Sequence, residues 1–294
     1  MACYHPIPAF RTADGKVVFR EGPDQVSSLF LPCGRCVGCR LERARQWSVR
    51  IMHEAKYYEE SSFLTLTYDD DHLPALNSLH YPDFQGFMKR LREKVGRVRF
   101  FMCGEYGEDH GRPHYHAGIF GTAFRSDRRY WRSSDAGFRL FRSPTLEGLW
   151  PFGNCEIGEL TSESAAYMAR YTFKKVTGQG AEEHYRVVNP ETGEVSARVP
   201  EFCRMSLKPG IGARWYEEHG RYCHEFDQVV VKGVPSKPPR YYDKLLERVD
   251  PDRMEQLRFD RELKARLGAA DNTNERLAVR ETVALARARN YRRS

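Results

Sequence analysis

The sequence lacks the segments that would carry the protein into or across a membrane. No apolar run approaches the ~20 residues that a membrane-spanning helix requires. Residues 1–6 do not begin a basic region followed by an apolar one, which is the pattern of a secretory signal. We therefore predict a cytoplasmic protein.

The sequence also lacks a G-x-x-x-x-G-K-[S/T] loop, in which backbone N–H groups cradle nucleotide phosphates. An ATPase site of this kind is not expected, so any unwinding of a duplex would need another protein. The chain does carry an excess of basic residues, 47 lysines and arginines against 40 acidic residues, for a net charge of +7. This excess favours a polyanionic partner, although charge alone does not separate DNA, RNA and anionic lipid.

Three of the eight cysteines form a C-x2-C-x2-C cluster at Cys33, Cys36 and Cys39. This spacing places three thiolates around one tetrahedral ion, which favours a structural zinc. Cys3 is the best candidate for the fourth ligand, and His5 is the second. An iron–sulfur cluster of the ferredoxin type would need a further Cys-Pro after three more residues, which is absent. The alternative is a group of reduced thiols that bind no metal.

Two histidines lie two positions apart in the apolar segment 112–120. The alternation predicts a strand, on which His114 and His116 project from one face while apolar side chains fill the other. Two imidazoles on one face are close enough to share a divalent metal. Without a further ligand, the pattern is more typical of two ordinary histidines on a half-buried sheet.

A carboxylate is expected across a hairpin from these histidines. Residues 98–105 predict a buried strand ending in Glu105, after which the chain turns and returns along the histidine strand. Glu105 is therefore the candidate third ligand, and it fits better than Glu108, which lies in the turn. Three ligands on one side of a metal leave open positions for phosphate oxygens. The alternative is an ordinary carboxylate at the end of a strand.

A second chemical motif follows in residues 167–175. In a helix, Tyr167 and Tyr171 lie one turn apart on the same face, and Lys174 follows three residues after Tyr171. A metal can polarise a phosphate, a phenolate can attack it, and an ammonium group can offset the growing negative charge. Together with the histidine strand, this helix predicts nucleophilic attack on a phosphodiester.

The other patterns predict a mixture of helices and strands. Helices are expected at 41–58 and 82–95, and strands at 62–68 and 152–157, before a tyrosine helix capped by Ser162 or Ser164. Residues 122–150 interleave arginines with aromatic rings, which suits single-stranded DNA but is also typical of a charged surface loop.

The C-terminal third of the sequence contains turn signals, then a charged tail. Residues 183–202 predict a hairpin, and the glycine-containing segment 205–212 could approach phosphate through backbone N–H groups. The proline-rich segment 234–242 predicts a stiff linker. The last fifty residues are helical in pattern and end in arginines.

These motifs resemble the HUH endonucleases, in which U denotes a hydrophobic residue. Within them, the sequence is most similar to the rolling-circle replication initiators of gokushovirus-type microviruses, small single-stranded DNA phages. The matching segments occur in order along most of the chain, at 3–6, 33–39, 64–68, 103–107, 111–116, 167–174, 205–212 and 239–242. The tail beyond about residue 250 carries little resemblance.

The resemblance implies an α/β (α+β) fold. A central, mainly antiparallel sheet would carry the histidines on a central strand, with helices packed on one face and the tyrosine helix near the metal. The implied domains are a cysteine-rich element over 1–40, a nicking domain over 41–240 and a charged helical extension over 241–294. Insertions in the nicking domain are expected at 121–150 and 178–212.

The resemblance also implies a reaction. Tyr167 and Tyr171 would nick the origin of the double-stranded replicative form, with Lys174 beside them and Mg²⁺ or Mn²⁺ held by Glu105, His114 and His116. The tyrosine becomes linked to the 5′ phosphate and frees a 3′ hydroxyl for a host polymerase. Rejoining needs no nucleotide cofactor, because the phosphotyrosine preserves the ester. Origin DNA, a host helicase and a host polymerase are the implied partners, in the cytoplasm of the bacterial host.

Three other functions remain open on the residues alone. A transposase or relaxase of the same superfamily shares the chemistry, although these usually place their tyrosines differently. A non-enzymatic, zinc-containing nucleic-acid-binding protein would explain the charge and the cysteines. A phosphodiesterase that uses metal-bound water would need the histidines but no tyrosine.

Overall fold

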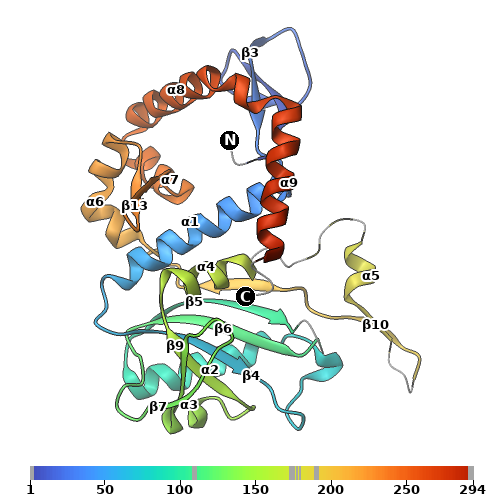
Figure 1. Cartoon of the computed structure of the whole chain (residues 1–294), viewed down its shortest axis with the longest axis vertical. Helices are drawn as coiled ribbons and strands as arrows, with labels where there is room; N and C mark the ends of the chain where they lie inside the picture. The colour runs from blue at the N-terminus through green and yellow to red at the C-terminus, as the bar shows by residue number, and fades with distance from the viewer. Residues whose placement is uncertain are drawn as a thin grey trace. The chain divides into compact units, whose positions relative to one another are not determined.

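The computed structural model describes residues 3–107, 111–171, 176, 178, 180–188 and 192–290, with the backbone alone for Tyr171 and for 288–290. The chain forms two compact units (Figure 1). Residues 1–43 and 243–294 make up the first unit, and residues 44–242 make up the second. Within the described ranges, no helix is both long enough and apolar enough to cross a membrane.

A seven-stranded antiparallel sheet forms the centre of the second unit (Figure 1). Its strands, in spatial order, are β12 (Phe202–Met205), β5 (Arg99–Tyr106), β6 (Pro113–Phe120), β4 (Ser61–Thr67), β9 (Cys155–Glu159), β8 (Arg139–Arg142) and β7 (Arg129–Ser133). The prediction of a large antiparallel sheet with the histidines on an inner strand is confirmed. The segment 121–150, predicted as an insertion, supplies β7, β8 and the helix α3 (Pro144–Leu149).

Helices cover both faces of this sheet. On one face, α2 (Tyr81–Val95) buries Phe84, Phe87, Met88 and Leu91 against the strands, with α3 beside it. On the other face pack α4 (Ser162–Tyr171) and the part of α1 (Val37–Ala55) that belongs to this unit. Our expectation of helices on one face alone was wrong. The strands β5 and β6 are buried along nearly their whole length, so both of their faces require an apolar cover.

The helix α4 begins differently from the prediction. The backbone N–H of Ser164 donates to Thr161 Oγ1 at 3.3 Å, and the N–H of Thr161 donates to Ser164 Oγ at 2.8 Å. This reciprocal pair is the arrangement of a capping box. Thr161 therefore caps the helix, in place of Ser162 or Ser164.

The rest of the second unit consists of short elements. They are the 3₁₀ turn η1 (Ala75–Asn77), α5 (Ala181–Tyr185), β10 (Arg186–Val188), β11 (Val195–Ala197), α6 (Ala213–Glu225), β13 (Val229–Val231) and β14 (Val234–Ser236). The predicted hairpin after residue 183 is present as β10 paired with β11, although residues 189–191 of its turn lie outside the described residues.

The segment 234–242 is not a linker. Its first residues form β14, which pairs with β13, and its last residues begin α7 (Arg240–Val249). Tyr242 is fully buried, its hydroxyl lies 2.8 Å from His53 Nδ1, and its ring stacks on Trp215. The prolines therefore lead into a packed aromatic cluster of the second unit.

The glycine-containing segment 205–212 is also packed against protein. The N–H of Gly212 donates to Glu54 Oε2 at 2.7 Å. Gly210 lies against Tyr241, whose hydroxyl would overlap an added Cβ. These glycines allow a close approach within the fold, and the contacts do not support the phosphate-binding interpretation.

The first unit combines both ends of the chain. Its three-stranded sheet has the order β2 (Val17–Val18), β1 (Ile7–Thr12) and β3 (Gln25–Leu31). The C-terminal part contains α8 (Pro251–Leu267), the 3₁₀ turn η2 (Ala269–Asn272) and α9 (Asn274–Asn290), so the predicted helical tail is confirmed. Ion pairs from Arg11 to Glu262 and from His5 to Glu281 connect the two ends.

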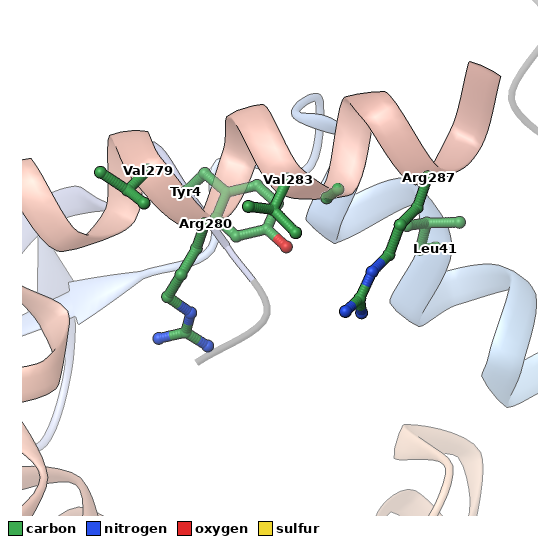
Figure 2. Close-up of a pocket in the computed structure, with 7 residues that line it drawn as sticks. Tyr4, Leu41, Val279, Arg280, Val283 and Arg287 are labelled. Carbon is green, nitrogen blue, oxygen red and sulfur yellow. The ribbon is translucent and has the colours of Figure 1, made fainter. Parts of the chain in front are cut away.

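A cavity of about 430 Å³ lies within this unit (Figure 2). It is lined by Tyr4, the beginning of α1 at Leu41, and one side of α9 from Val279 to Arg287. Tyr4 lies between Cys3 and the ion-paired His5, so this part of the N-terminal segment faces the C-terminal helix.

Candidate active site

Three predicted metal ligands meet on one face of the seven-stranded sheet. The register of the β5–β6 hairpin puts Glu105 directly opposite His114, and cross-strand partners project from the same face. The Nε2 atoms of His114 and His116 lie 2.8 and 2.9 Å from the same atom, Glu105 Oε1. One ligand atom from each residue lies within 4.8 Å of the others. The hairpin therefore brings together all three residues that the sequence singled out.

The protonation state of the group suits a cation. Burial alone would raise the pKa of Glu105, but the hydrogen bonds and positive charge of His114 and His116 lower it to about 2. The residue is therefore a carboxylate at neutral pH. The Nδ1–H of His114 donates to the carbonyl oxygen of Arg112 at 3.1 Å, so the lone pair of the neutral imidazole lies on Nε2. Two imidazole nitrogens and a carboxylate oxygen form a donor set that accepts Mn²⁺ readily and Mg²⁺ more weakly.

His116 is oriented by neighbours that the sequence reasoning did not assign to the site. Thr65 lies opposite it on β4, and Thr65 Oγ1 is 3.1 Å from His116 Nδ1. The ring of Phe63 stacks on the imidazole with centroids 5.4 Å apart. Partners of this kind fix the orientation of a metal-binding histidine. The alternating pattern of strand 62–68 was the available signal, because residues 63, 65 and 67 share one face.

Tyr167 lies on the same side of the sheet as the histidines. Its ring centroid is 5.2 Å from that of His116, and the two planes are at 80°. The side chain is 36% exposed, and the guanidinium of Arg170 lies 5.8 Å from the ring centroid. A glycine permits this approach, because a Cβ at Gly118 would lie 3.0 Å from Met168 Cε of α4. The structure therefore brings one predicted nucleophile beside the candidate metal ligands.

The other two predicted catalytic residues are less fully described. The backbone of Tyr171 ends α4, one turn after Tyr167. Its side chain, and all of Lys174, lie outside the described residues.

The four predicted zinc ligands also come together, in the first unit. One Sγ atom from each of Cys3, Cys33, Cys36 and Cys39 lies within 4.8 Å of the others. Backbone N–H groups point at this sulfur cluster: that of Cys33 is 3.2 Å from Cys3 Sγ, and that of Cys36 is 3.4 Å from Cys33 Sγ. Burial opposes ionisation of Cys33, but the backbone N–H groups of Cys36 and Arg35 lower its pKa to about 7.

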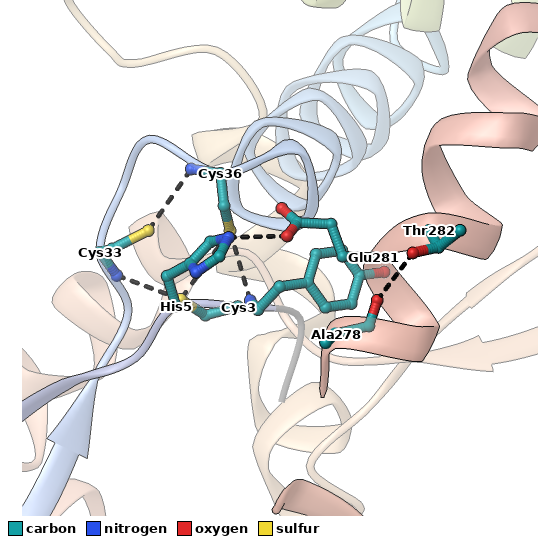
Figure 3. A network of polar contacts seen from close by, with 8 residues as sticks. Cys3, His5, Cys33, Cys36, Ala278, Glu281 and Thr282 are labelled. Carbon is teal, nitrogen blue, oxygen red and sulfur yellow. Dashed lines mark hydrogen bonds and ion pairs between the residues drawn. The ribbon is translucent and has the colours of Figure 1, made fainter. Parts of the chain in front are cut away.

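Cys3, and not His5, is the fourth member of this cluster. The imidazole of His5 instead lies 2.7 Å from Glu281 of α9 (Figure 3). Four sulfurs at mutual ligand distance, together with N–H groups that stabilise thiolates, fit a tetrahedral zinc site.

Comparison with known proteins places the chain among phage proteins. It is 32% identical over 267 residues to replication-associated protein VP4 of Bdellovibrio phage phiMH2K, a match that covers 86% of this chain and 79% of the relative. The chain belongs to the family of phage replication-associated proteins. Replication-associated protein ORF2 of Spiroplasma virus 4 is 32% identical over 275 residues, covering 84% of this chain and 81% of the relative. Replication-associated protein ORF4 of Chlamydia phage 1 is 31% identical over 240 residues, covering 78% and 57%.

A family model for replication-associated proteins of the ORF2 type matches residues 61–176 of this replication-associated protein. The matched segment begins with β4 and extends past the end of α4. It therefore contains Glu105, His114, His116 and Tyr167. No solved structure matches the chain.

Proposed function

We propose that this protein is a rolling-circle replication initiator with the HUH endonuclease fold. It nicks one strand at the phage origin, remains joined to the DNA, and later reseals a strand. The principal support is a single juxtaposition: Glu105, His114 and His116 share one point on the sheet, and Tyr167 lies beside them. Membership of a family of phage replication-associated proteins supports the biological role.

The residues divide the work of transesterification. A divalent ion held by Glu105, His114 and His116 would act as a Lewis acid on the scissile phosphate. The hydroxyl of Tyr167 or Tyr171 attacks phosphorus and loses its proton to solvent or a nearby base. The new bond joins the tyrosine oxygen to phosphorus, and the P–O3′ bond breaks. The departing oxygen takes a proton and becomes the 3′ hydroxyl, which primes a host polymerase.

Lys174 has an electrostatic role in this proposal. In a helix, it follows Tyr171 by three residues, so its ammonium group is placed to offset charge on the pentavalent phosphate. Arg170 already lies 5.8 Å from the Tyr167 ring centroid, which adds positive charge to the same helix. Resealing reverses the chemistry, when a 3′ hydroxyl attacks the phosphotyrosine and releases the enzyme.

We further propose that residues 41–240 carry the nicking activity and that the first unit holds a structural zinc. The first unit has a sheet of three short strands, and Phe19, Val26 and Phe30 are more than half exposed. A small core of this kind gains much of its stability from a bound metal. Zinc at the four cysteines would tie residues 3 and 33–39 together.

The experiment that tests nicking uses the full chain and labelled single-stranded fragments of its own phage genome. We expect a protein–DNA adduct that resists denaturant, forms with Mn²⁺ or Mg²⁺, and is abolished by EDTA. A matched control is Tyr222→Phe, which changes an exposed tyrosine on α6 and should leave the adduct unchanged.

The outcome also separates the competing functions. Cleavage without a protein–DNA adduct would indicate a phosphodiesterase that uses water. DNA binding with neither cleavage nor an adduct would indicate a non-enzymatic nucleic-acid-binding protein. An adduct at sites other than the phage origin would indicate transposase or relaxase chemistry. In the initiator we propose, the origin is nicked in the host cytoplasm and a host helicase separates the strands.

A further inference from the structure

The two outermost strands of the sheet form a basic ribbon, which we define as β7 and β8. Residues 125–142 contain six arginines and two aspartates and no lysine or glutamate, for a formal charge of +4. Two adjacent rings on β7 are half exposed, Tyr130 at 54% and Trp131 at 50%. Because β7 ends the sheet, no further strand of the described chain borders this surface.

A β-bulge sorts the ribbon side chains onto two faces. Tyr130 pairs with Phe141 and Arg132 pairs with Leu140, so Trp131 is the extra residue between them. In a bulge, the extra residue and its successor project to nearly the same side. Trp131 therefore accompanies Arg132, while Tyr130 accompanies Phe141 on the opposite side.

The face that carries Trp131 is the face of the candidate active site. His116 pairs with Thr65, and Thr65 pairs with Glu156 of β9. Arg132 Nε then reaches Glu156 Oε1 at 2.8 Å. A row of polar side chains thus extends across the sheet from the histidines to the ribbon. From β6 to β7 it spans four strand spacings, about 19 Å at ~4.8 Å for each spacing.

Arg142 supports Trp131 on this face. Its guanidinium lies 4.3 Å from the centroid of the Trp131 ring and donates to Asn154 Oδ1 at 3.1 Å. Arg142 is also the direct cross-strand partner of Arg129. Two like charges in directly opposite positions destabilise a sheet, and an anion placed between them removes that repulsion. The ribbon therefore offers an exposed ring next to a phosphate-sized cluster of positive charge.

We infer that Trp131, Arg129 and Arg142 form a subsite for single-stranded DNA that runs from the candidate active site to the sheet edge. The inference rests on the proposed function for the identity of the polymer. An unpaired base stacks on Trp131, and its phosphate lies between the two guanidinium groups. A single strand fits this combination because its bases are free to stack, whereas those of a duplex are stacked on one another.

The test measures binding in EDTA, so that it does not depend on cleavage. The probe is fluorescein-labelled oligothymidylate of about 20 nucleotides, longer than the ~4–16 nucleotides that one single-strand-binding fold usually covers. Trp131→Ala should raise Kd about tenfold, the loss expected for one stacked base. Arg142→Gln should reduce the slope of log K against log salt by about 0.7, the contribution of one phosphate on a single strand.

The opposite face of the same ribbon provides matched controls. Tyr130 is as exposed as Trp131, and Arg139 lies 5.2 Å from the Tyr130 ring as Arg142 lies near Trp131. Tyr130→Ala and Arg139→Gln should bind the probe like the unchanged protein. Trp131→Phe retains a ring for stacking, so it should recover most of the affinity even if Trp131→Ala folds poorly.

Three results would overturn the inference: equal affinity in Trp131→Ala, equal losses in Trp131→Ala and Tyr130→Ala, or an equal loss for a duplex of the same length. The proposed function fails separately. A protein that binds the probe through Trp131 but forms no adduct with phage DNA contradicts only the nicking reaction. One that forms the adduct but binds equally well without Trp131 contradicts only the subsite.

Discussion

The phenol ring of Tyr167 lies edge-on to the imidazole of His116, with the ring centroids 5.2 Å apart. This contact joins a helix and a strand that are separated by 51 residues of sequence. It leaves the Tyr167 side chain 36% exposed, so the hydroxyl remains accessible to a substrate. The candidate nucleophile and a candidate metal ligand thus share one partly open surface, which is the arrangement that phosphoryl transfer to a protein side chain requires.

Thr65 is expected to control metal affinity through His116. Thr65→Val removes the hydroxyl that lies 3.1 Å from His116 Nδ1, and the loss of such a partner typically weakens metal binding 10–100-fold. Isothermal titration with Mn²⁺ would measure the change. Thr67→Val is the matched control, since Thr67 lies on the same strand face opposite His114. Equal Mn²⁺ affinity in the Thr65 variant would show that this hydroxyl does not position the ligand.

The zinc proposal predicts a coupled loss of metal and stability. Cys36→Ser removes one of four thiolates, so zinc content measured by elemental analysis should fall well below one per chain. The thermal midpoint should fall by about 5 °C or more, because each kcal/mol shifts the midpoint of a domain of this size by ~2–4 °C. Cys203→Ser changes a half-buried cysteine outside the cluster and should retain the zinc. A normally folded protein that purifies without zinc would contradict the proposal.

His53 should make the second unit less stable in acid. Burial lowers its pKa to about 3, and the charges of Lys56 and His219 act in the same direction. The unfolded chain, with a histidine pKa near ~6.5, therefore binds more protons than the folded chain between about pH 3 and 6.5. This contribution to stability is complete above pH 6.5 and is lost as the pH falls through that window.

Denaturant unfolding at a series of pH values would measure this effect. One histidine can contribute a slope of up to ~1.4 kcal/mol per pH unit. His53→Gln keeps a hydrogen-bonding group near the Tyr242 hydroxyl but does not titrate, so its stability should depend less on pH. Parallel curves for the two proteins would show that His53 is not responsible.

Local pattern was sufficient to predict the metal ligands. The period of two on a strand placed His114 and His116 on one face, and a short hairpin then placed Glu105 opposite them. These relationships depend on residues that are close in sequence. The cysteine cluster was predictable for a related reason, since the spacing of Cys33, Cys36 and Cys39 itself specifies a ligand geometry.

Contacts between distant segments were not predictable in the same way. The segment 234–242 was interpreted as a linker because its prolines are typical of one. Its end is instead fixed by Tyr242, which packs with His53, 189 residues earlier, and with Trp215. The position of Tyr167 relative to His116 likewise depends on how α4 packs over Gly118, which no local period specifies. Tertiary packing thus decided what these residues do.

The paired tyrosines lead to the last prediction. An isolated phenol has a pKa of about 10 and is mostly protonated at neutral pH, so the nearby cation and Lys174 are expected to favour the phenolate. Tyr167 and Tyr171 lie one turn apart on α4, and a small adjustment of the helix would let either address the same phosphate. Each single Tyr→Phe change should therefore leave some cleavage or joining of short oligonucleotides. The double change should remove the covalent adduct completely.

Peptide mapping of the adduct tests this pairing directly. Tyr171 has the Y-x-x-K spacing to Lys174, so we expect it to make the first cut, with Tyr167 acting in the second. DNA should then be found on Tyr171 with an initiation substrate and on both tyrosines when a termination substrate is supplied. Tyr57→Phe, which changes a tyrosine hydrogen-bonded to Glu218 outside the site, serves as the control. If DNA is found on a single tyrosine under both conditions, one residue is the nucleophile and the other only packs against the sheet.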